Sequence, residues 1–270
     1  MASPDPSLLS LNTATVSKQW TLAQMIEGCA RHGIRGIAPW RDKLAEMGVT
    51  EAAKAIKANG LTVTGVCRGG FFTAKDWLDD NRRAIEEAHA LGAHCLVLVV
   101  GGLPGGSKDL IRARERVKES ISMVLPEARK AGVRLAIEPL HPMQAAERAC
   151  INTLEQALDI CDALGDGIGV AVDVYHVWWD PKLEQQIRRA GKKRIFAYHL
   201  CDWLVPTRDL LNDRGMMGDG VIDLPRIRSW VEAAGYAGMH EVEIFSERDW
   251  WRRDPDEVLR TCKERFATVT

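Results

Sequence analysis

Four side chains that can bind a metal ion or transfer a proton follow four apolar segments in the second half of the chain. They are Glu138, Asp173, His199 and Glu243. Three carboxylates directed at one point repel one another unless a cation neutralises them. Carboxylates with one imidazole suit Mn²⁺, Mg²⁺ or Co²⁺ better than a metal that prefers thiolates, and they are also compatible with Zn²⁺. If the fold brings the four together, we expect one divalent ion, with Mn²⁺ favoured.

Each of these residues taken alone has a simpler interpretation, as a capped or ion-paired group at the end of a strand. Four such groups on adjacent strands favour a shared site over four separate ion pairs. Glu241 competes with Glu243 for the fourth position, because side chains two residues apart on a strand point to the same face. Position along the strand must decide between the two glutamates.

The segments that carry these residues alternate short apolar runs with longer amphipathic stretches. We predict strands over residues 8–11, 34–38, 61–66, 95–100, 133–137, 168–172, 195–198 and 241–245. We predict helices over residues 21–32, 49–59, 76–91, 109–131, 152–164, 182–190, 224–234 and 254–266. Eight strand–helix units average about 34 residues each, which is long enough for a βαβ arrangement.

This rhythm predicts an α/β fold, namely a single (β/α)₈ TIM barrel in one domain spanning residues 1–270. An open doubly wound sheet is disfavoured because no G-x-G-x-x-G motif follows the first strand. A barrel places its active site at the carboxyl ends of its strands, where the four candidate ligands would then meet.

Composition excludes several classes of partner. The chain has 36 basic and 37 acidic residues, a formal charge of −1, so it lacks the basic footprint of a nucleic-acid-binding protein. No apolar run approaches the ~18 residues of a membrane helix, and residues 1–6 do not resemble a secretory signal. Seven scattered cysteines without a C-x-x-C pair indicate a reducing compartment. We therefore expect a cytoplasmic protein without nucleic-acid or membrane partners.

The motifs around the candidate ligands resemble those of a known superfamily. Ile-Glu138-Pro, Val-Asp173-Val-Tyr-His176, His199-Leu-Cys-Asp202 and Val-Glu243 are similar to the motif set of the xylose isomerase-like TIM barrels, which include sugar phosphate isomerases and epimerases. The resemblance covers the last four predicted strands. In the first half of the chain it extends only to the alternation of strands and helices. It implies one divalent ion bound through Glu138, Asp173, His199 and Glu243. It also selects Glu243 over Glu241, through the Gly-Tyr-Ala-Gly segment that precedes the last ligand.

The resemblance implies the chemistry as well. Glu138 and Glu243 would be the catalytic acid–base pair of a ketose or keto-sugar isomerase or epimerase. One would remove a proton α to a carbonyl through a metal-stabilised ene-diolate, and the other would return it. His176 resembles a residue that binds a substrate hydroxyl, and Arg214 resembles a loop arginine that holds a substrate oxygen. The alternatives are a supporting role for His176 beside Asp173 and a loop salt bridge for Arg214.

Two residues depart from the epimerase pattern. Related epimerases carry a further glutamate six positions after the first ligand, where this chain has Gln144, and His141 adds a titratable group. His141 as a substrate-binding acid could protonate a leaving group, as a lyase requires. A dehydratase, or a lyase that eliminates from a 3-keto-sugar or 3-keto-glycoside, is therefore the alternative function.

Aromatic residues follow several predicted strands and favour a sugar-sized substrate. Trp40, Trp179 and Trp203 are candidates for stacking on a sugar, or for burying one another in a lid or a homo-oligomer contact. A tryptophan-rich rim with few basic residues predicts an unphosphorylated sugar. The glycine-rich segment 101–106 is a weak phosphate-binding candidate.

Two other functions are less favoured. A DNA-repair nuclease of the same fold needs a basic face, which the chain lacks. A non-catalytic binding protein would not need the four candidate ligands, which the chain carries.

Overall fold

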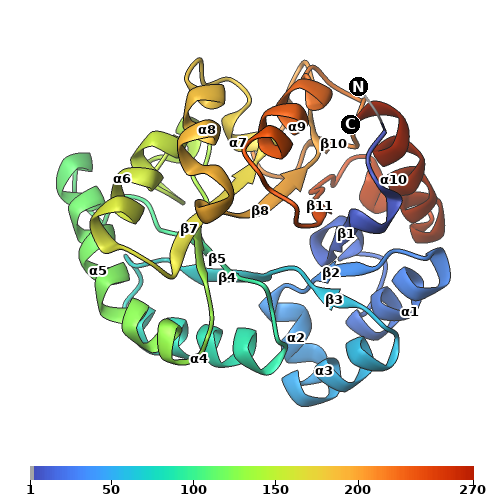
Figure 1. The fold of residues 1–270 in the computed structure, drawn as a ribbon, viewed down its shortest axis with the longest axis horizontal. Helices are drawn as coiled ribbons and strands as arrows, with labels where there is room; N and C mark the ends of the chain where they lie inside the picture. The colour runs from blue at the N-terminus through green and yellow to red at the C-terminus, as the bar shows by residue number, and fades with distance from the viewer. Residues whose placement is uncertain (1–2) are drawn as a thin grey trace.

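The strands form a nearly closed parallel barrel surrounded by helices (Figure 1). The computed structural model describes residues 3–270, so the first two positions of the predicted domain and of the predicted non-secretory N-terminus lie outside the described residues. The sheet runs in the order β3-β2-β1-β11-β8-β7-β6-β5-β4. Its strands are β1 (Leu9–Asn12), β2 (Gly36–Ala38), β3 (Thr62–Val63), β4 (Val66–Gly70), β5 (Leu96–Val99), β6 (Leu135–Ile137), β7 (Ile168–Asp173), β8 (Ile195–Leu200) and β11 (His240–Val242). The predicted TIM barrel is confirmed.

The prediction of one strand over residues 61–66 is wrong. The structure has two strands here, because the chain changes its pairing partner between them: β3 pairs with β2 and β4 pairs with β5. The backbone N–H of Thr64 donates to Ile37 O, whereas that of Val66 donates to Cys95 O. After this change β4 runs beyond the predicted end and brings later residues to the carboxyl end of the barrel.

Helices cover the outside of the barrel and follow the predicted positions closely. They are α1 (Leu22–His32), α2 (Arg41–Met47), α3 (Val49–Ala58), α4 (Trp77–Ala90), α5 (Leu110–Lys130), α6 (Leu154–Leu164), α7 (Val174–Val177), α8 (Leu183–Arg194), α9 (Leu224–Ala233) and α10 (Pro255–Val269). Thr21 forms a capping box with Gln24, and Gly33 ends α1 in the left-handed conformation, as the sequence signals predict. The short α2 and α7 were not predicted. Within residues 3–270, no helix is long and apolar enough to span a membrane.

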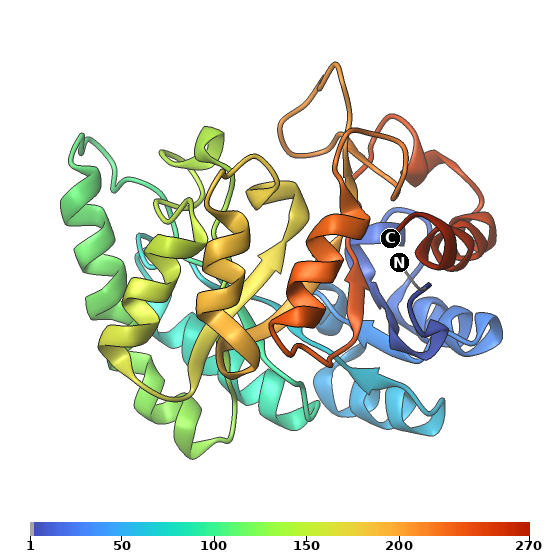
Figure 2. The same ribbon diagram turned by 45° about the horizontal axis from the view of Figure 1, so that its top comes forward.

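The core has two layers. The larger one lies between the strands and the helices. A smaller one fills the barrel and consists of Cys67, Cys95, Val97, Ala136, Ala171, Phe196 and Ala197. All seven cysteines are buried and unpaired, as expected of small core residues. Figure 2 shows the orange segment around β9 (Asp202–Trp203) and β10 (Arg214–Gly215) rising above the barrel.

Gly169 comes directly before the register shift between β7 and β8 at Val170 and Ala171, after which Asp173 faces His199. A Cβ at this position would lie 2.3 Å from the backbone oxygen of Arg194. Since that backbone cannot move aside, we expect Gly169→Ala to cost about 2 kcal/mol of unfolding free energy, as overpacking does. Urea denaturation measures it. Gly65→Ala is the control, because its nearest neighbour would lie 3.6 Å away; equal losses in both variants would contradict the steric argument.

Candidate metal centre

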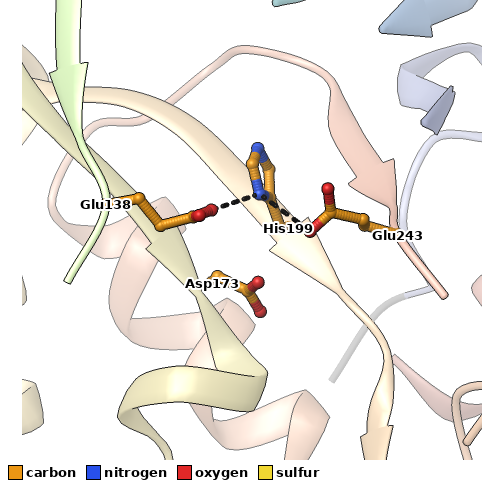
Figure 3. Close-up of side chains that lie close together, drawn as sticks. All are labelled: Glu138, Asp173, His199 and Glu243. Carbon is orange, nitrogen blue, oxygen red and sulfur yellow. Dashed lines mark ion pairs between the residues drawn. The ribbon is translucent and has the colours of Figure 1, made fainter. Parts of the chain in front are cut away.

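The four predicted ligands converge at the carboxyl end of the barrel (Figure 3). Glu138 follows β6, Asp173 ends β7, His199 lies in β8 and Glu243 follows β11. One ligand atom from each residue lies within 4.8 Å of the others. Asp173 and His199 are 0% exposed, and Glu138 and Glu243 are 6% and 3% exposed. The cluster therefore gathers three carboxylates in a nearly water-free place.

Strand periodicity explains how four strands direct these groups to one point. Side chains two residues apart share a face of a strand, so the residue two positions before each ligand also faces the barrel interior. Those positions hold Ala136, Ala171, Ala197 and Glu241, and all four residues are buried. Three of the four supporting residues are therefore small, and the fourth places another carboxylate beneath the cluster.

Glu241 supports His199 rather than competing with Glu243. His199 Nε2 lies 3.4 Å from Glu241 Oε1, while Nδ1 is directed toward the cluster. Asn12 Nδ2 donates to Oε1 of Glu241 at 2.7 Å, and Thr64 Oγ1 donates to its Oε2 at 2.8 Å. A carboxylate beside one ring nitrogen fixes the histidine tautomer and turns the other nitrogen toward a metal. Position along the strand thus gives the two glutamates different tasks.

Polar atoms of the cluster are left without protein partners. His199 Nδ1 lies 3.1 Å from Glu138 Oε1 and 3.8 Å from Glu243 Oε2. Nevertheless, neither Nδ1 nor Glu138 Oε1 has a hydrogen-bond partner among the described residues, and His199 Nε2 has only the 3.4 Å ion-pair contact with Glu241. Buried polar atoms are normally satisfied. A divalent cation would satisfy both atoms and offset the carboxylate charge, so the residues fit a hard or borderline metal ion.

Burial and crowding shift the pKa values of the metal-free cluster. Burial, reinforced by the carboxylate of Glu138, raises the pKa of Glu243 to about 8. Burial alone would lower the pKa of His199, but the nearby carboxylates of Glu241 and of the cluster hold it well above its usual value. Both groups therefore bind protons near neutral pH that a cation would displace.

Arg214 enters the cluster from the segment that rises above the barrel. One guanidinium nitrogen lies 2.9 Å from Asp173 Oδ2 and 3.2 Å from Glu243 Oε2. Asp202 holds this segment by accepting hydrogen bonds from the backbone N–H groups of Gly218, Gly220 and Ile222. The structure thus brings Arg214 into the site, paired with two ligand carboxylates.

His176 lies beside the cluster as an uncharged ring. Its Nδ1 accepts a hydrogen bond from the backbone N–H of His141 at 3.1 Å. Its Nε2 lies 3.1 Å from a guanidinium nitrogen of Arg214 and 3.7 Å from Asp173 Oδ2. Burial lowers the pKa of His176 to about 3, so the ring is neutral at physiological pH. Because it also lines the cavity described below, both predicted roles, hydroxyl binder and partner of Asp173, are compatible with its position.

The predicted rim residues divide into two groups. Trp40 lines the cavity that opens onto the cluster, whereas His141, Trp179 and Trp203 are not among the residues that line it. The His141 ring packs against Trp179 and Trp203 at centroid distances of 5.6 and 5.0 Å, and Trp203 lies 4.7 Å from Tyr175. These rings bury one another, and direct substrate contact by His141, Trp179 and Trp203 stays a prediction.

A narrow cavity opens onto the cluster. Of the four ligands, only Glu138 and Glu243 are part of its described lining, and Gln144 lies in the wall. Sequence reasoning missed Arg68 and Arg148, which also line it. The expectation of few basic residues here is wrong, because β4 extends further than predicted and the loop after β6 folds back over the barrel mouth. The sequence does contain a signal for both arginines, because Arg68 follows the third predicted strand and Arg148 follows the fifth.

The chain matches a family model described as the xylose isomerase-like TIM barrel over residues 26–262. It belongs to that family. The inosose isomerase of Bacillus velezensis is 27% identical over 284 residues, covering 97% of this chain and 96% of that protein.

Solved structures share the fold of this chain. A crystal structure of a protein from Sinorhizobium meliloti 1021 is 61% identical, with a TM-score of 0.96 over 98% of this chain and 99% of that chain. A crystal structure of the IOLI protein contains a bound zinc atom; it is 24% identical, with a TM-score of 0.79 over 97% of both chains. At that identity the likeness to IOLI shows the fold alone.

Glu241→Gln replaces the anionic support of His199 in this family member with a neutral amide. Because the ligand loses its orienting charge, we expect metal affinity to fall about 10–100-fold. Competition between the protein and a chromogenic chelator for Mn²⁺ measures the change. Glu247→Gln, an exposed position after β11, is the matched control and should bind Mn²⁺ like the wild type. Unchanged affinity in Glu241→Gln would contradict the supporting role.

The metal-free protein should lose stability as the pH rises from about 5 to 8. The folded-state pKa of Glu243 is about 8, against 4.5 ordinarily, so in this window the folded state binds more protons than the unfolded state. Rising pH then favours unfolding, and the raised pKa of His199 acts in the same direction. Melting temperatures of metal-stripped protein across this range test the sign.

Glu243→Gln should flatten this dependence, whereas the exposed Glu86→Gln should keep the wild-type slope. Added Mn²⁺ should stabilise the wild type most at pH 8, where proton competition is weakest. A wild-type stability that rises over the whole window without metal would contradict the pKa of Glu243.

Proposed function

We propose that the protein is a divalent-metal-dependent isomerase or epimerase that abstracts a proton next to the carbonyl of a ketose or keto-sugar. One observation carries this proposal: Glu138 and Glu243 approach His199 from opposite sides and both line the cavity (Figure 3). Asp173 and His199, by contrast, are completely buried. Two carboxylates can therefore reach a substrate while the other two residues only hold a metal. The inosose isomerase among the relatives supports an isomerase.

The proposed reaction assigns one glutamate to each proton transfer. A carboxylate oxygen of one removes the proton from the carbon next to the carbonyl. The C–H electron pair forms a carbon–carbon double bond as the carbonyl oxygen gains negative charge. The opposite glutamate, protonated at the start, returns a proton to the other face of that carbon in an epimerase. In an isomerase, the proton is delivered to the neighbouring carbon, while the hydroxyl on the carbon that lost the first proton gives its own proton to the former carbonyl oxygen and becomes the new carbonyl. When bound, a divalent ion would supply Lewis-acid stabilisation of the oxygen.

Arg214 and His176 position the substrate in this proposal. Arg214 lines the cavity, and its guanidinium pairs with the carboxylates of Asp173 and Glu243. From this position it can also donate a hydrogen bond to a substrate oxygen next to the reacting carbon. His176 presents a neutral ring that can hydrogen-bond a hydroxyl without adding charge. Both assignments follow from position in the cavity wall.

We propose Mn²⁺ as the metal in use, with Mg²⁺ or Co²⁺ as substitutes, because three carboxylates outnumber the single imidazole. The zinc atom in the IOLI structure is compatible with the same class of ion. We also propose a cytoplasmic location, since all seven thiols are unpaired. The predicted homo-oligomer stays a prediction.

The structure gives less support to the lyase alternative. That alternative assigned a leaving-group proton to His141, whose ring packs between Trp179 and Trp203 outside the described cavity lining. General-acid chemistry needs a group within hydrogen-bond reach of the leaving oxygen. We therefore place proton transfer at the two glutamates ahead of elimination.

Glu138→Gln and Glu243→Gln should each lower turnover by about 10²–10⁴-fold, the usual contribution of a general acid or base. The assay incubates Mn²⁺-loaded protein in D₂O with a 3-keto-glycoside and with a panel of ketoses, inososes and their acids and phosphates, and follows deuterium incorporation and product release by NMR. Glu247→Gln is the control and should retain wild-type exchange. Loss of water or of an aglycone from a 3-keto-glycoside, without exchange in any ketose, would favour the lyase and overturn the proposal.

A further inference from the structure

Arg68 and Arg148 lie at the cavity wall without a counterion. Both side chains are partly buried, and the Nε atom of each is shielded from solvent without a hydrogen-bond partner within residues 3–270. Neither guanidinium forms an ion pair or a side-chain hydrogen bond with any residue that the structure describes. A desolvated cation without a partner costs free energy, so the pair calls for a functional explanation.

Other shielded arginines in the same barrel are paired. Arg41 contacts Asp80 at 2.9 Å and Glu87 at 2.5 Å, and Arg214 binds two carboxylates of the cluster. The fold thus supplies acidic partners where an arginine is structural. Burial, together with the neighbouring Arg148, lowers the pKa of Arg68 to about 10. A paired carboxylate would raise this pKa, and Arg68 has none.

An aromatic ring holds the two guanidiniums in place. Arg68 stacks on Phe71 at 3.8 Å from the ring centroid, and Arg148 lies 6.0 Å from the same ring. Phe71 has a φ of 47°, a left-handed conformation that is costly for a residue with a bulky side chain. The backbone is therefore strained at the residue that brings the ring to both arginines, and this is typical of a preorganised binding site.

The two arginines join the reaction cavity to a second hollow. The cavity lined by Glu138 and Glu243 shares part of its wall with an adjoining surface groove. The shared residues are Trp40, Arg68, Arg148, Leu211 and Phe245. The groove also has Lys18 and Lys43, with Asp42 as its acidic residue. The two guanidiniums therefore lie at the junction between this groove and the cavity of the glutamates.

We propose that Arg68 and Arg148 form a subsite for an anionic group, a carboxylate or a phosphate, at the end of the substrate remote from the reacting carbon. Guanidinium groups match both anions through paired N–H donors. The substrate class is then an acidic or phosphorylated keto-sugar, in place of the neutral sugar that the sequence predicts. This assignment of a substrate class rests on the proposed function, whereas the anion site itself rests on the arginines alone.

The competing explanation is that these arginines only screen the cluster carboxylates. The carboxylates of Glu138 and Glu243 act on Arg148 at a distance and partly offset the burial that lowers its pKa, but neither forms an ion pair with it. Arg214 already occupies the position between Asp173 and Glu243, so screening does not explain why Arg68 and Arg148 lie at the cavity wall without a paired carboxylate. A bound divalent cation would also reduce the negative charge that screening would serve. An external anion satisfies both guanidiniums whether or not the metal is bound.

The test measures binding of inorganic phosphate, D-glycerate and uncharged glycerol by calorimetry at low ionic strength. Wild-type protein should bind at least one anion and should not bind glycerol, and the tighter anion identifies the charged group. Arg68→Gln and Arg148→Gln should each weaken anion binding about tenfold or more, as loss of charge-assisted hydrogen bonds does. Arg116→Gln, an exposed arginine on α5, should bind like the wild type. No anion binding by the wild type, or binding that survives both substitutions, overturns the proposal.

Two further readouts separate the subsite from a structural role and from the metal. Without anion, both glutamine variants should keep or raise the wild-type melting temperature, because an uncompensated buried charge is removed. Lower stability with undiminished anion binding makes the arginines structural and overturns the proposal. Arg148→Lys, which keeps the charge, should bind with intermediate affinity.

The titrations are run on metal-stripped and on Mn²⁺-loaded protein. Binding that depends on the arginines in both forms supports the subsite. Binding that needs the metal and ignores the arginines places the anion on the ion and overturns it. None of these measurements uses turnover, so a failed anion site leaves the glutamate exchange results intact, and a failed isomerase leaves anion binding intact.

Discussion

Three carboxylates buried at one end of a barrel repel one another where charge is poorly screened, and the surrounding structure is organised around that repulsion. Arg214 sits between Asp173 and Glu243, and the imidazole of His199 sits between Glu138 and Glu243. Without metal, Glu243 keeps a proton up to about pH 8. A bound divalent ion would supply the positive charge that the protein alone lacks.

The two halves of the chain contribute differently to this arrangement. All four ligands come from the second half, but the carboxylate behind His199 is held by Asn12 and Thr64 from the first half. The first half also supplies Arg68 and Phe71 to the cavity mouth. We infer that metal chemistry is located mainly in the later strands, whereas substrate choice depends largely on loops of the earlier ones.

Particular elements show why the fold was more predictable than the pocket. The run Cys95–Val100 reads as a strand buried on both faces, and Thr21 and Gly33 mark helix ends, because these signals depend on neighbours in the sequence. The third strand was mispredicted because a change of pairing partner at Thr64 depends on the strands on either side. Arg68 was missed for the same reason, since its place at the mouth follows from where β4 ends.

Local sequence patterns predicted the barrel and placed Glu138, Asp173 and His199 at strand ends, because alternation and strand-end position are local properties. These patterns left Glu241 and Glu243 open, and only the resemblance to the family selected Glu243. Only the tertiary structure decided that Glu241 stands behind His199, that Arg214 joins the ligands, and that His141 packs among tryptophans. It also decided that two arginines without counterions face the same cavity as the two accessible glutamates. These are contacts between segments far apart in the chain, and their distances exist only once the barrel closes.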